Sequence, residues 1–174
     1  TPSESKHMHR CKVTYGVFSM LIFMISHSGA LSQNALSATF QQLDSLQKNE
    51  ARPVMVFIHS DWCKYCEAME QVTFEDQRVS KLLTQNFYGI SLDAEDQRDI
   101  RLLGKTFRFK PTGNGTGRHE LAEELAAVNG GITFPTLCFL NADYEIIYQH
   151  QGYLSPEQLL QLLKLLSKPP VDNL

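Results

Sequence analysis

The sequence predicts an α/β domain in which a central mixed β-sheet is flanked by helices. Helical and strand patterns alternate along most of the chain, which is typical of a sheet whose strands are joined by crossover helices. Two strand patterns then follow one another directly before the last helix, which indicates an antiparallel hairpin at one side of the sheet. Continuous apolar runs at residues 54–58 and 136–140 indicate strands that are buried on both faces.

The first half of the domain is predicted to hold a helix, a strand, a kinked helix and a second strand. Pro53 ends the first helical pattern, and Cys63 stands where the first strand gives way to the second helix. That second helix has a break in its periodicity at residues 73–76. The expected elements are residues 37–49, 54–58, 63–83 and 87–92.

The second half begins with an atypical segment, residues 96–129, which we interpret as an insertion. Its three glycines at residues 113–117 predict a loop. Ser155 as N-cap and Pro156 at the first helical position mark the start of the last helix. The expected elements are a strand at 105–110, a loop at 111–117, a helix at 120–127, strands at 136–140 and 144–149, and a helix over 155–168.

Composition and the N-terminal pattern indicate how the chain is organised. The net charge is −3, which argues against a nucleic-acid partner because such proteins normally carry a basic excess. Residues 8–32 show a short basic start, an apolar stretch and small residues at Ala30 and Ser32, the order of a secretory signal peptide. We therefore expect a leader at residues 1–32, cleavage between Ser32 and Gln33, and one domain at residues 33–174.

This leader predicts an exported, periplasmic protein. Its apolar stretch is shorter than the roughly 20 residues that span a bilayer, although an uncleaved N-terminal membrane anchor is the alternative. The exported part then keeps Cys63, Cys66 and Cys138, too few cysteines for a framework of several structural disulfides. We expect Cys138, inside an apolar strand, to be a buried and unreactive thiol.

Cys63 and Cys66 are the candidate catalytic residues. Two cysteines separated by two residues, at the start of a helix, suit reversible disulfide chemistry. Unpaired N–H groups at the helix start favour the Cys63 thiolate, and the positive charge of Lys64 would favour it further. Cys63 is then the nucleophile and Cys66 the resolving thiol. The alternatives are a structural disulfide, half of a zinc site with His59 and Cys138, or a carrier of Cu(I).

The chain resembles the thioredoxin family at three separated places. Residues 61–66, Asp-Trp-Cys-Lys-Tyr-Cys, resemble the family's W-C-x-x-C active site, and residues 131–136, Gly-Ile-Thr-Phe-Pro-Thr, resemble its cis-proline loop. Gly152 resembles the glycine ahead of the last helix. Residues 74–76 and 93–95 are further similar to exported bacterial thiol:disulfide oxidoreductases and to the C-terminal domain of DsbD-type reductases.

The resemblance implies a thioredoxin fold over residues 37–168 and a substrate site around the disulfide. It implies that Pro135 is cis and that the backbone of Thr133 and Phe134 is exposed to pair with a substrate peptide. Trp62 is expected to cover the disulfide and to contact substrate. No cofactor is expected beyond the redox-active disulfide, and no metal.

Two departures from the family pattern stand out. The acidic residue that thioredoxins bury beneath the disulfide falls at Phe57, and a nearby strand lysine falls near Gly89. The usual proton acceptor for the second cysteine is therefore missing, and Asp61, Glu67 or water would have to replace it. The second departure is the insertion at residues 96–129, which either shapes partner choice or is a structural elaboration.

These observations predict an exported thiol–disulfide oxidoreductase that reduces or exchanges protein disulfides. Its partners are protein thiols and disulfides, and a DsbD-type membrane protein is implied as electron donor. The sequence leaves open whether it works as a reductase or as an oxidase or isomerase. The alternative is a thioredoxin-fold binding or chaperone module with a non-catalytic disulfide.

Overall fold

The computed structural model describes residues 34–113 and 115–167, and the predicted leader at residues 1–32 lies outside these ranges. Among the described residues, no helix is both long enough and apolar enough to cross a bilayer. The elements in order are α1 (Phe40–Asn49), β1 (Val54–His59), α2 (Lys64–Ala68), the π-helix η1 (Met69–Thr73), α3 (Gln77–Asn86), β2 (Tyr88–Asp93), β3 (Ile100–Leu102), β4 (Lys105–Phe107), β5 (Phe109–Gly113), β6 (Thr116–His119), α4 (Glu120–Ala126), β7 (Thr136–Leu140), β8 (Ile146–Gln151) and α5 (Pro156–Leu166).

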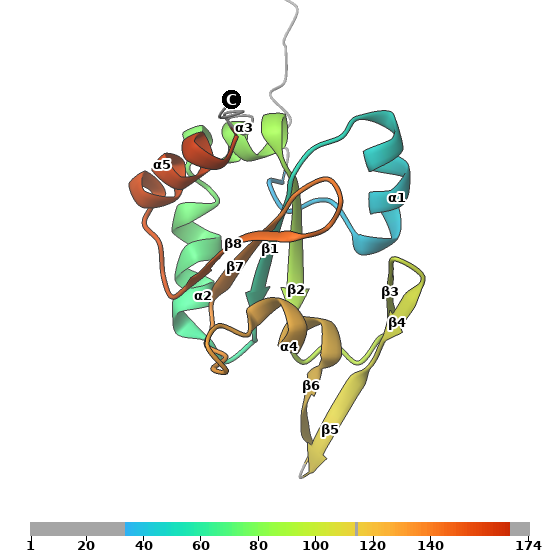
Figure 1. Cartoon of the computed structure of the whole chain (residues 1–174). Helices are drawn as coiled ribbons and strands as arrows, with labels where there is room; N and C mark the ends of the chain where they lie inside the picture. Colours follow the sequence, from blue (N-terminus) through green and yellow to red (C-terminus); the bar gives the residue numbers. More distant parts are fainter. Residues whose placement is uncertain (1–33, 114, 168–174) are drawn as a thin grey trace, which may run out of the picture. The chain divides into compact units, whose positions relative to one another are not determined.

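A four-stranded mixed sheet forms the centre of the fold, as the sequence predicts. Its strand order is β2-β1-β7-β8, with β1 parallel to β2 and antiparallel to β7, and β8 antiparallel to β7 (Figure 1). The predicted hairpin at the end of the chain is therefore β7–β8, on the side of the sheet away from β2. Because β1 and β2 run in the same direction, the loops that follow them lie at the same end of the sheet.

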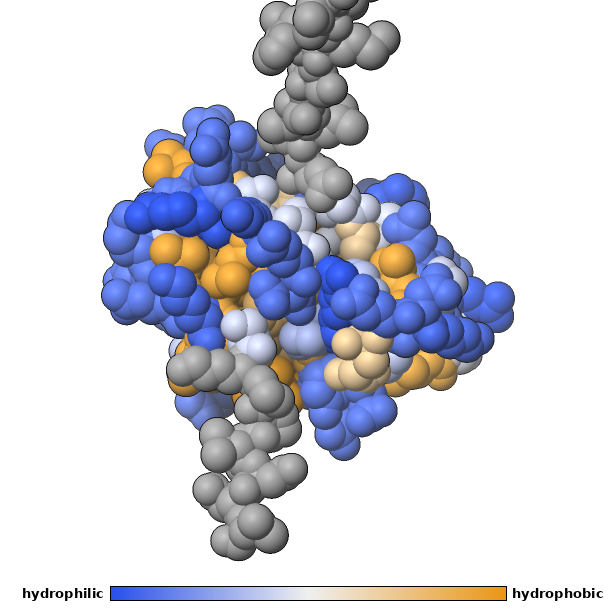
Figure 2. Space-filling view, turned by 90° about the horizontal axis from the view of Figure 1, so that it is seen from above, coloured by the Kyte–Doolittle hydropathy of each residue, from blue (hydrophilic) through white to orange (hydrophobic). Residues whose placement is uncertain are grey.

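The two faces of the sheet are covered by different helices. Along β1 the side chains alternate, so that Val56 and Ile58 face one cluster of buried residues while Met55 and Phe57 face the other. Helices α1 and α4 pack into the first cluster, and α2, α3 and α5 pack into the second. Figure 2 shows the fold from above, where most of the described surface is hydrophilic and the apolar residues appear in small groups.

The predicted break in the second helix is confirmed. The helix passes from α2 into η1, then turns at residues 74–76 before α3 begins. The carboxylate of Asp76 caps α3 by accepting hydrogen bonds from the backbone N–H groups of Arg78 and Val79 at 2.9 and 3.3 Å. The last helix also starts as expected, with Ser155 as N-cap and Pro156 in the first turn.

Two predictions for the inserted segment are wrong. The expected strand over residues 105–110 is interrupted at Arg108, so that residues 105–107 form β4 and residues 109–110 begin β5. The expected loop over residues 111–117 is instead part of a hairpin, because β5 pairs with β6 in an antiparallel register that sets Lys110 opposite Arg118. Strand β3 carries only three residues and was not predicted; it pairs with β4.

Candidate active site

The Cys63–Cys66 pair lies directly after β1, where the sequence predicts it. The two residues form a disulfide with their Cα atoms 5.2 Å apart. Cys63 is the N-cap of α2, and its sulfur accepts a hydrogen bond from the backbone N–H of Cys66 at 3.2 Å. Both residues are buried, with 7% of Cys63 and 2% of Cys66 exposed, so solvent reaches Cys63 more readily.

This cap position explains how a helix start can activate Cys63. In the reduced protein the same backbone N–H would point at the sulfur of Cys63, and a negatively charged acceptor makes a stronger hydrogen bond than a neutral one. The partial positive charge of the helix N-terminus acts in the same direction. The local geometry therefore favours the thiolate of Cys63, which is the nucleophilic form.

The predicted cis-proline is confirmed at the Phe134–Pro135 bond. Its loop is held by hydrogen bonds from Gly152 N to Pro135 O at 2.8 Å and from the Thr136 hydroxyl to Thr133 O at 2.7 Å. Within the described residues, the backbone N–H groups of Thr133 and Phe134 have no hydrogen-bond partner. They are therefore free to bind an extended peptide, and this role stays a prediction.

Trp62 lies beside the disulfide, with 67% of its surface exposed. Its indole Nε1 donates a hydrogen bond to the carboxylate of Glu95 at 3.0 Å, and its ring meets that of Phe134 edge-on at 6.0 Å between centroids. Phe134 in turn packs against the buried cluster that contains both cysteines. The structure thus places Trp62 and Phe134 against each other beside this cluster and adds Glu95, and the predicted contact of Trp62 and Phe134 with substrate stays a prediction.

The residues predicted to tune the thiols are all on the surface. Asp61, Lys64 and Glu67 are exposed, and Glu67 accepts a hydrogen bond from the side chain of Gln71 at 3.1 Å. Phe57, at the position of the missing acid, is fully buried in the same cluster as the cysteines and packs edge-on against Phe74. An apolar ring therefore stands where a proton acceptor is usual, and the predicted roles of Asp61, Lys64 and Glu67 remain predictions.

Gly89, near the position of the family's strand lysine, has no room for a side chain. A Cβ atom at this position would lie 2.0 Å from the backbone oxygen of Ala35. The chain before α1 runs across β2 at this point, where Ala38 N donates to Gly89 O at 3.0 Å. Close approach of two backbones, rather than chemistry at the disulfide, explains the glycine.

One group of side chains near the disulfide could hold a metal ion. His59, Asp61 and Asp93 each offer a ligand atom, and these atoms lie within 4.8 Å of one another. His59 also stacks on Phe57 and shares a hydrogen bond of 2.9 Å with the hydroxyl of Ser91. This agrees with the sequence interpretation that His59 packs beside the end of the strand.

Cys138 is fully buried, and burial raises the pKa of its thiol to about 12. It belongs to the cluster on the opposite face of the sheet from Cys63 and Cys66. The sheet therefore separates it from the disulfide, and the alternative of a zinc site that joins Cys138 to the pair is wrong.

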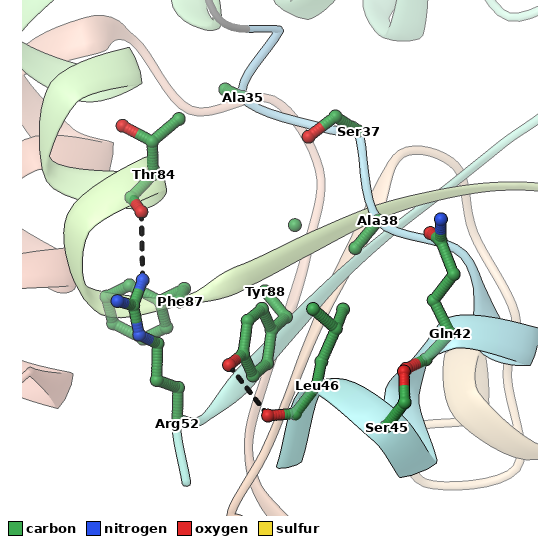
Figure 3. A pocket seen from close by; sticks show the side chains of 11 residues that line it. Ala35, Ser37, Ala38, Gln42, Ser45, Leu46, Arg52, Thr84, Phe87 and Tyr88 are labelled. Atoms are coloured by element: carbon green, nitrogen blue, oxygen red, sulfur yellow. Dashed lines mark hydrogen bonds between the residues drawn. The ribbon is translucent and has the colours of Figure 1, made fainter. Parts of the chain in front are cut away.

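A pocket of about 390 Å³ lies at the other end of β1 and β2. Figure 3 shows it between the chain before α1 and the start of β2, with Arg52 and Tyr88 among the residues that line it. Both side chains are already engaged there: Arg52 donates to Thr84 O at 3.1 Å, and the Tyr88 hydroxyl donates to Leu46 O at 3.1 Å. None of the residues around the disulfide lines this pocket.

Fold and site together define the class of protein. The family model described as a thioredoxin-like domain matches residues 39–167, and the chain belongs to this family. Within this fold the Cys63–Cys66 disulfide lies after β1, at the place where the sequence predicts it.

Curated relatives match only part of this chain. It is 29% identical to Spermatogenesis-associated protein 20 of Rattus norvegicus over 91 residues, which are 51% of the chain and 11% of that protein. It is 30% identical to the thiol:disulfide interchange protein DsbD of Colwellia psychrerythraea over 96 residues, 42% of the chain and 16% of that protein. The match thus covers less than a fifth of the length of either relative.

Solved structures support the fold. A thioredoxin-fold protein from Helicobacter pylori matches with a TM-score of 0.55 and 14% identity, over 79% of this chain and 80% of that one. A disulphide isomerase from Xylella fastidiosa matches with a TM-score of 0.51 and 15% identity, over 74% and 88% of the two chains. The oxidised C-terminal domain of DsbD from Neisseria meningitidis matches with a TM-score of 0.50 and 14% identity, over 72% and 90%.

Proposed function

We propose that this chain is an exported reductase of protein disulfides. The observation that carries the proposal is the position of Cys63 as the cap of α2, where the Cys66 N–H points at its sulfur beside an exposed aromatic surface. This geometry presents a stabilised thiolate to an incoming disulfide. Export is supported by the leader-like pattern of residues 8–32.

The reaction proceeds through a mixed disulfide. The Cys63 thiolate attacks one sulfur of the substrate disulfide, and the other substrate sulfur leaves as a thiolate that takes a proton from water. Cys66 then loses its proton and attacks the sulfur of Cys63, which releases the second substrate thiol. Two electrons pass to the substrate, and the protein is left with the Cys63–Cys66 disulfide.

The proton of Cys66 has to leave without a buried acid. Phe57 fills the position beneath the pair, and the nearby carboxylates of Asp61 and Glu67 are exposed. Water, or one of these two carboxylates through water, accepts the proton. The buried ring of Phe57 also keeps bulk water away from the inner side of the disulfide, so that exchange takes place at its solvent-facing side.

A dithiol has to reduce the protein again after each turnover. For an exported protein this electron pair must come from across the membrane, and a DsbD-type protein is the donor that we propose. The similarity to DsbD supports this choice. Reduction of Cys63–Cys66 by such a protein reverses the steps above and needs no cofactor.

The test combines a trapping variant with a reduction potential. In Cys66→Ser the mixed disulfide between Cys63 and substrate should accumulate, whereas Cys63→Ser should form none and Cys138→Ser should behave as the unmodified chain. A potential near −270 mV, as in thioredoxin, would support a reductase, and one near −120 mV, as in DsbA, would make the protein an oxidant instead (both values approximate). Full function of Cys63→Ser would favour a binding or chaperone module with a non-catalytic disulfide.

A further inference from the structure

The β5–β6 hairpin of the insertion reaches the active site through Arg118. The central carbon of the Arg118 guanidinium lies over the ring of Phe134, 6.0 Å from its centroid. Phe134 directly precedes the cis-proline and also contacts Trp62. Figure 1 shows the hairpin extending from the end of the sheet at which β1 ends, which is the end that carries Cys63.

Arg118 has no acidic partner among the residues that the structure describes. Within the described residues its guanidinium makes no ion pair, although it is half-buried. Most other basic side chains of the insertion are paired with carboxylates: Arg98 with Asp96, Lys105 with Glu124, Arg108 with Asp99, and Lys110 with Glu120 and Glu123.

The register of the hairpin places Arg118 next to another positive charge. Lys110 stands directly opposite Arg118 on the paired strand, and like charges in that position are unfavourable. Lys110 is paired with two glutamates, whereas over residues 34–113 and 115–167 only the face of Phe134 offsets the charge of Arg118. The stability of the hairpin therefore does not account for an arginine here.

The hairpin is built firmly enough to fix where Arg118 lies. A Cβ at Gly117 would be 2.2 Å from the ring of Phe109, so the absent side chain lets that ring pack across the strand. His119 is fully buried, and its backbone N–H donates to Ala94 O at 2.7 Å, just after β2. Its ring caps α4 by accepting from Leu121 N at 3.2 Å.

The side chains around the disulfide then form a series with opposite charges at its ends. Glu95 contacts Trp62, Trp62 contacts Phe134, and Phe134 contacts Arg118. A peptide bound along the free N–H groups of the cis-proline loop would pass Arg118 on the side of Phe134. An acidic side chain there would gain a charge-assisted contact, whereas near Glu95 it would be repelled.

We propose that Arg118 is a specificity residue that selects substrate segments with an aspartate or glutamate beside the disulfide cysteine. This inference rests on the proposed function, since it concerns the substrate of the same disulfide exchange. It assigns a role to the insertion: the hairpin extends the substrate surface and supplies its positive charge.

The test compares three peptides, each with one internal disulfide. They differ only in the residue placed on both sides of the attacked cysteine, which is glutamate, glutamine or lysine. The full chain reduces them with a simple dithiol as electron donor, and kcat/KM is measured for each. The glutamate peptide should be preferred over the lysine peptide by about threefold to tenfold, the effect of one partly desolvated charged contact. Added salt should weaken the preference.

Substitutions separate charge recognition from other effects. Arg118→Gln should bring the ratio of kcat/KM for the glutamate peptide to kcat/KM for the lysine peptide to about one. Arg118→Glu should invert this preference, and Arg118→Lys should restore part of it. Arg101→Gln is the matched control, because Arg101 is an exposed arginine of the same insertion and has no ion pair within the described part of the chain. It lies on β3, which packs against α1. This variant should keep the preference of the unmodified chain.

The outcomes also separate this inference from the proposed function. If the unmodified chain reduces all three peptides equally well, or if Arg118→Gln keeps the preference for glutamate, Arg118 does not select substrates. If no peptide is reduced although the disulfide of the protein itself is reducible, the proposed function fails, and this inference fails with it.

Discussion

Replacement of Gly89 by alanine should destabilise the protein without affecting the disulfide. The new Cβ would lie 2.0 Å from Ala35 O, and at least 3.0 Å is needed, so the chain before α1 has to move by about 1 Å. This movement strains the hydrogen bond from Ala38 N to Gly89 O, whose net value is about 1 kcal/mol. The new Cβ also crowds the backbone of Ala35 and the side chain of Leu36, which lies 3.3 Å away, and such overpacking costs about 1–3 kcal/mol.

The expected loss is therefore about 2–4 kcal/mol in the free energy of unfolding. Urea unfolding followed by circular dichroism measures it, with an m-value that should not change. Gly131→Ala is the control: its Cβ would have no neighbour nearer than 3.7 Å, and its backbone is not in the left-handed region. That variant should differ from the unmodified chain by less than about 0.5 kcal/mol.

The same variant tests where the site lies. Gly89 pairs with Met55 near the start of β1, whereas Cys63 follows its end, so the exchange rate with a small disulfide should stay within about twofold under native conditions. A loss of stability below about 0.5 kcal/mol for Gly89→Ala would refute the reasoning. It would mean that the chain before α1 does not pack on β2 in solution.

Three further predictions concern single side chains. Cys138 should resist alkylation in the folded, reduced protein while Cys63 is labelled, because it is fully buried and its pKa is raised to about 12; equal labelling, read by mass spectrometry, would contradict this. Hydrogen bonds from Arg78 lower the pKa of Asp76 to about 2 from its ordinary 3.8, so the contribution of Asp76 to stability is present above about pH 4 and lost as the pH falls towards 2. The urea midpoint of Asp76→Asn should therefore vary less between about pH 4 and pH 2 than that of the unmodified chain, and the same pH dependence in both proteins would contradict this. Glu95→Ala should lower the fluorescence anisotropy of the chain's single tryptophan by freeing its indole, whereas Glu95→Gln should not; equal anisotropy in all three proteins would show that this hydrogen bond does not hold the ring.

Local signals explain which parts of the fold could be predicted from the sequence. The apolar run of β1 followed by Cys63 and Cys66, and the Ser155–Pro156 start of α5, depend on residues next to one another in the chain. The cis bond before Pro135 followed from a resemblance, not from local physics. The continuous apolar run at residues 136–140 also places Cys138 in a buried strand, although the sequence could not show on which face of the sheet it lies.

The inserted segment shows why a local signal can mislead. Three glycines at residues 113–117 predict a loop, and the turn of the β5–β6 hairpin does lie among them. Gly117, however, is inside β6, where its missing side chain makes room for the ring of Phe109. A glycine that bends the chain and a glycine that lets another residue approach look the same in a sequence.

The thiol pair and the disulfide chemistry that it predicts could be recognised in the sequence, because a pair at a strand-to-helix junction needs only residues that are close along the chain. The surroundings of that pair depend on the folded structure. Glu95 meets Trp62 and Arg118 meets Phe134 only because the ends of β2 and β6 fold back beside the cis-proline loop. These partners lie far apart along the chain, and their contacts depend on strand order and register, which no local pattern of residues specifies.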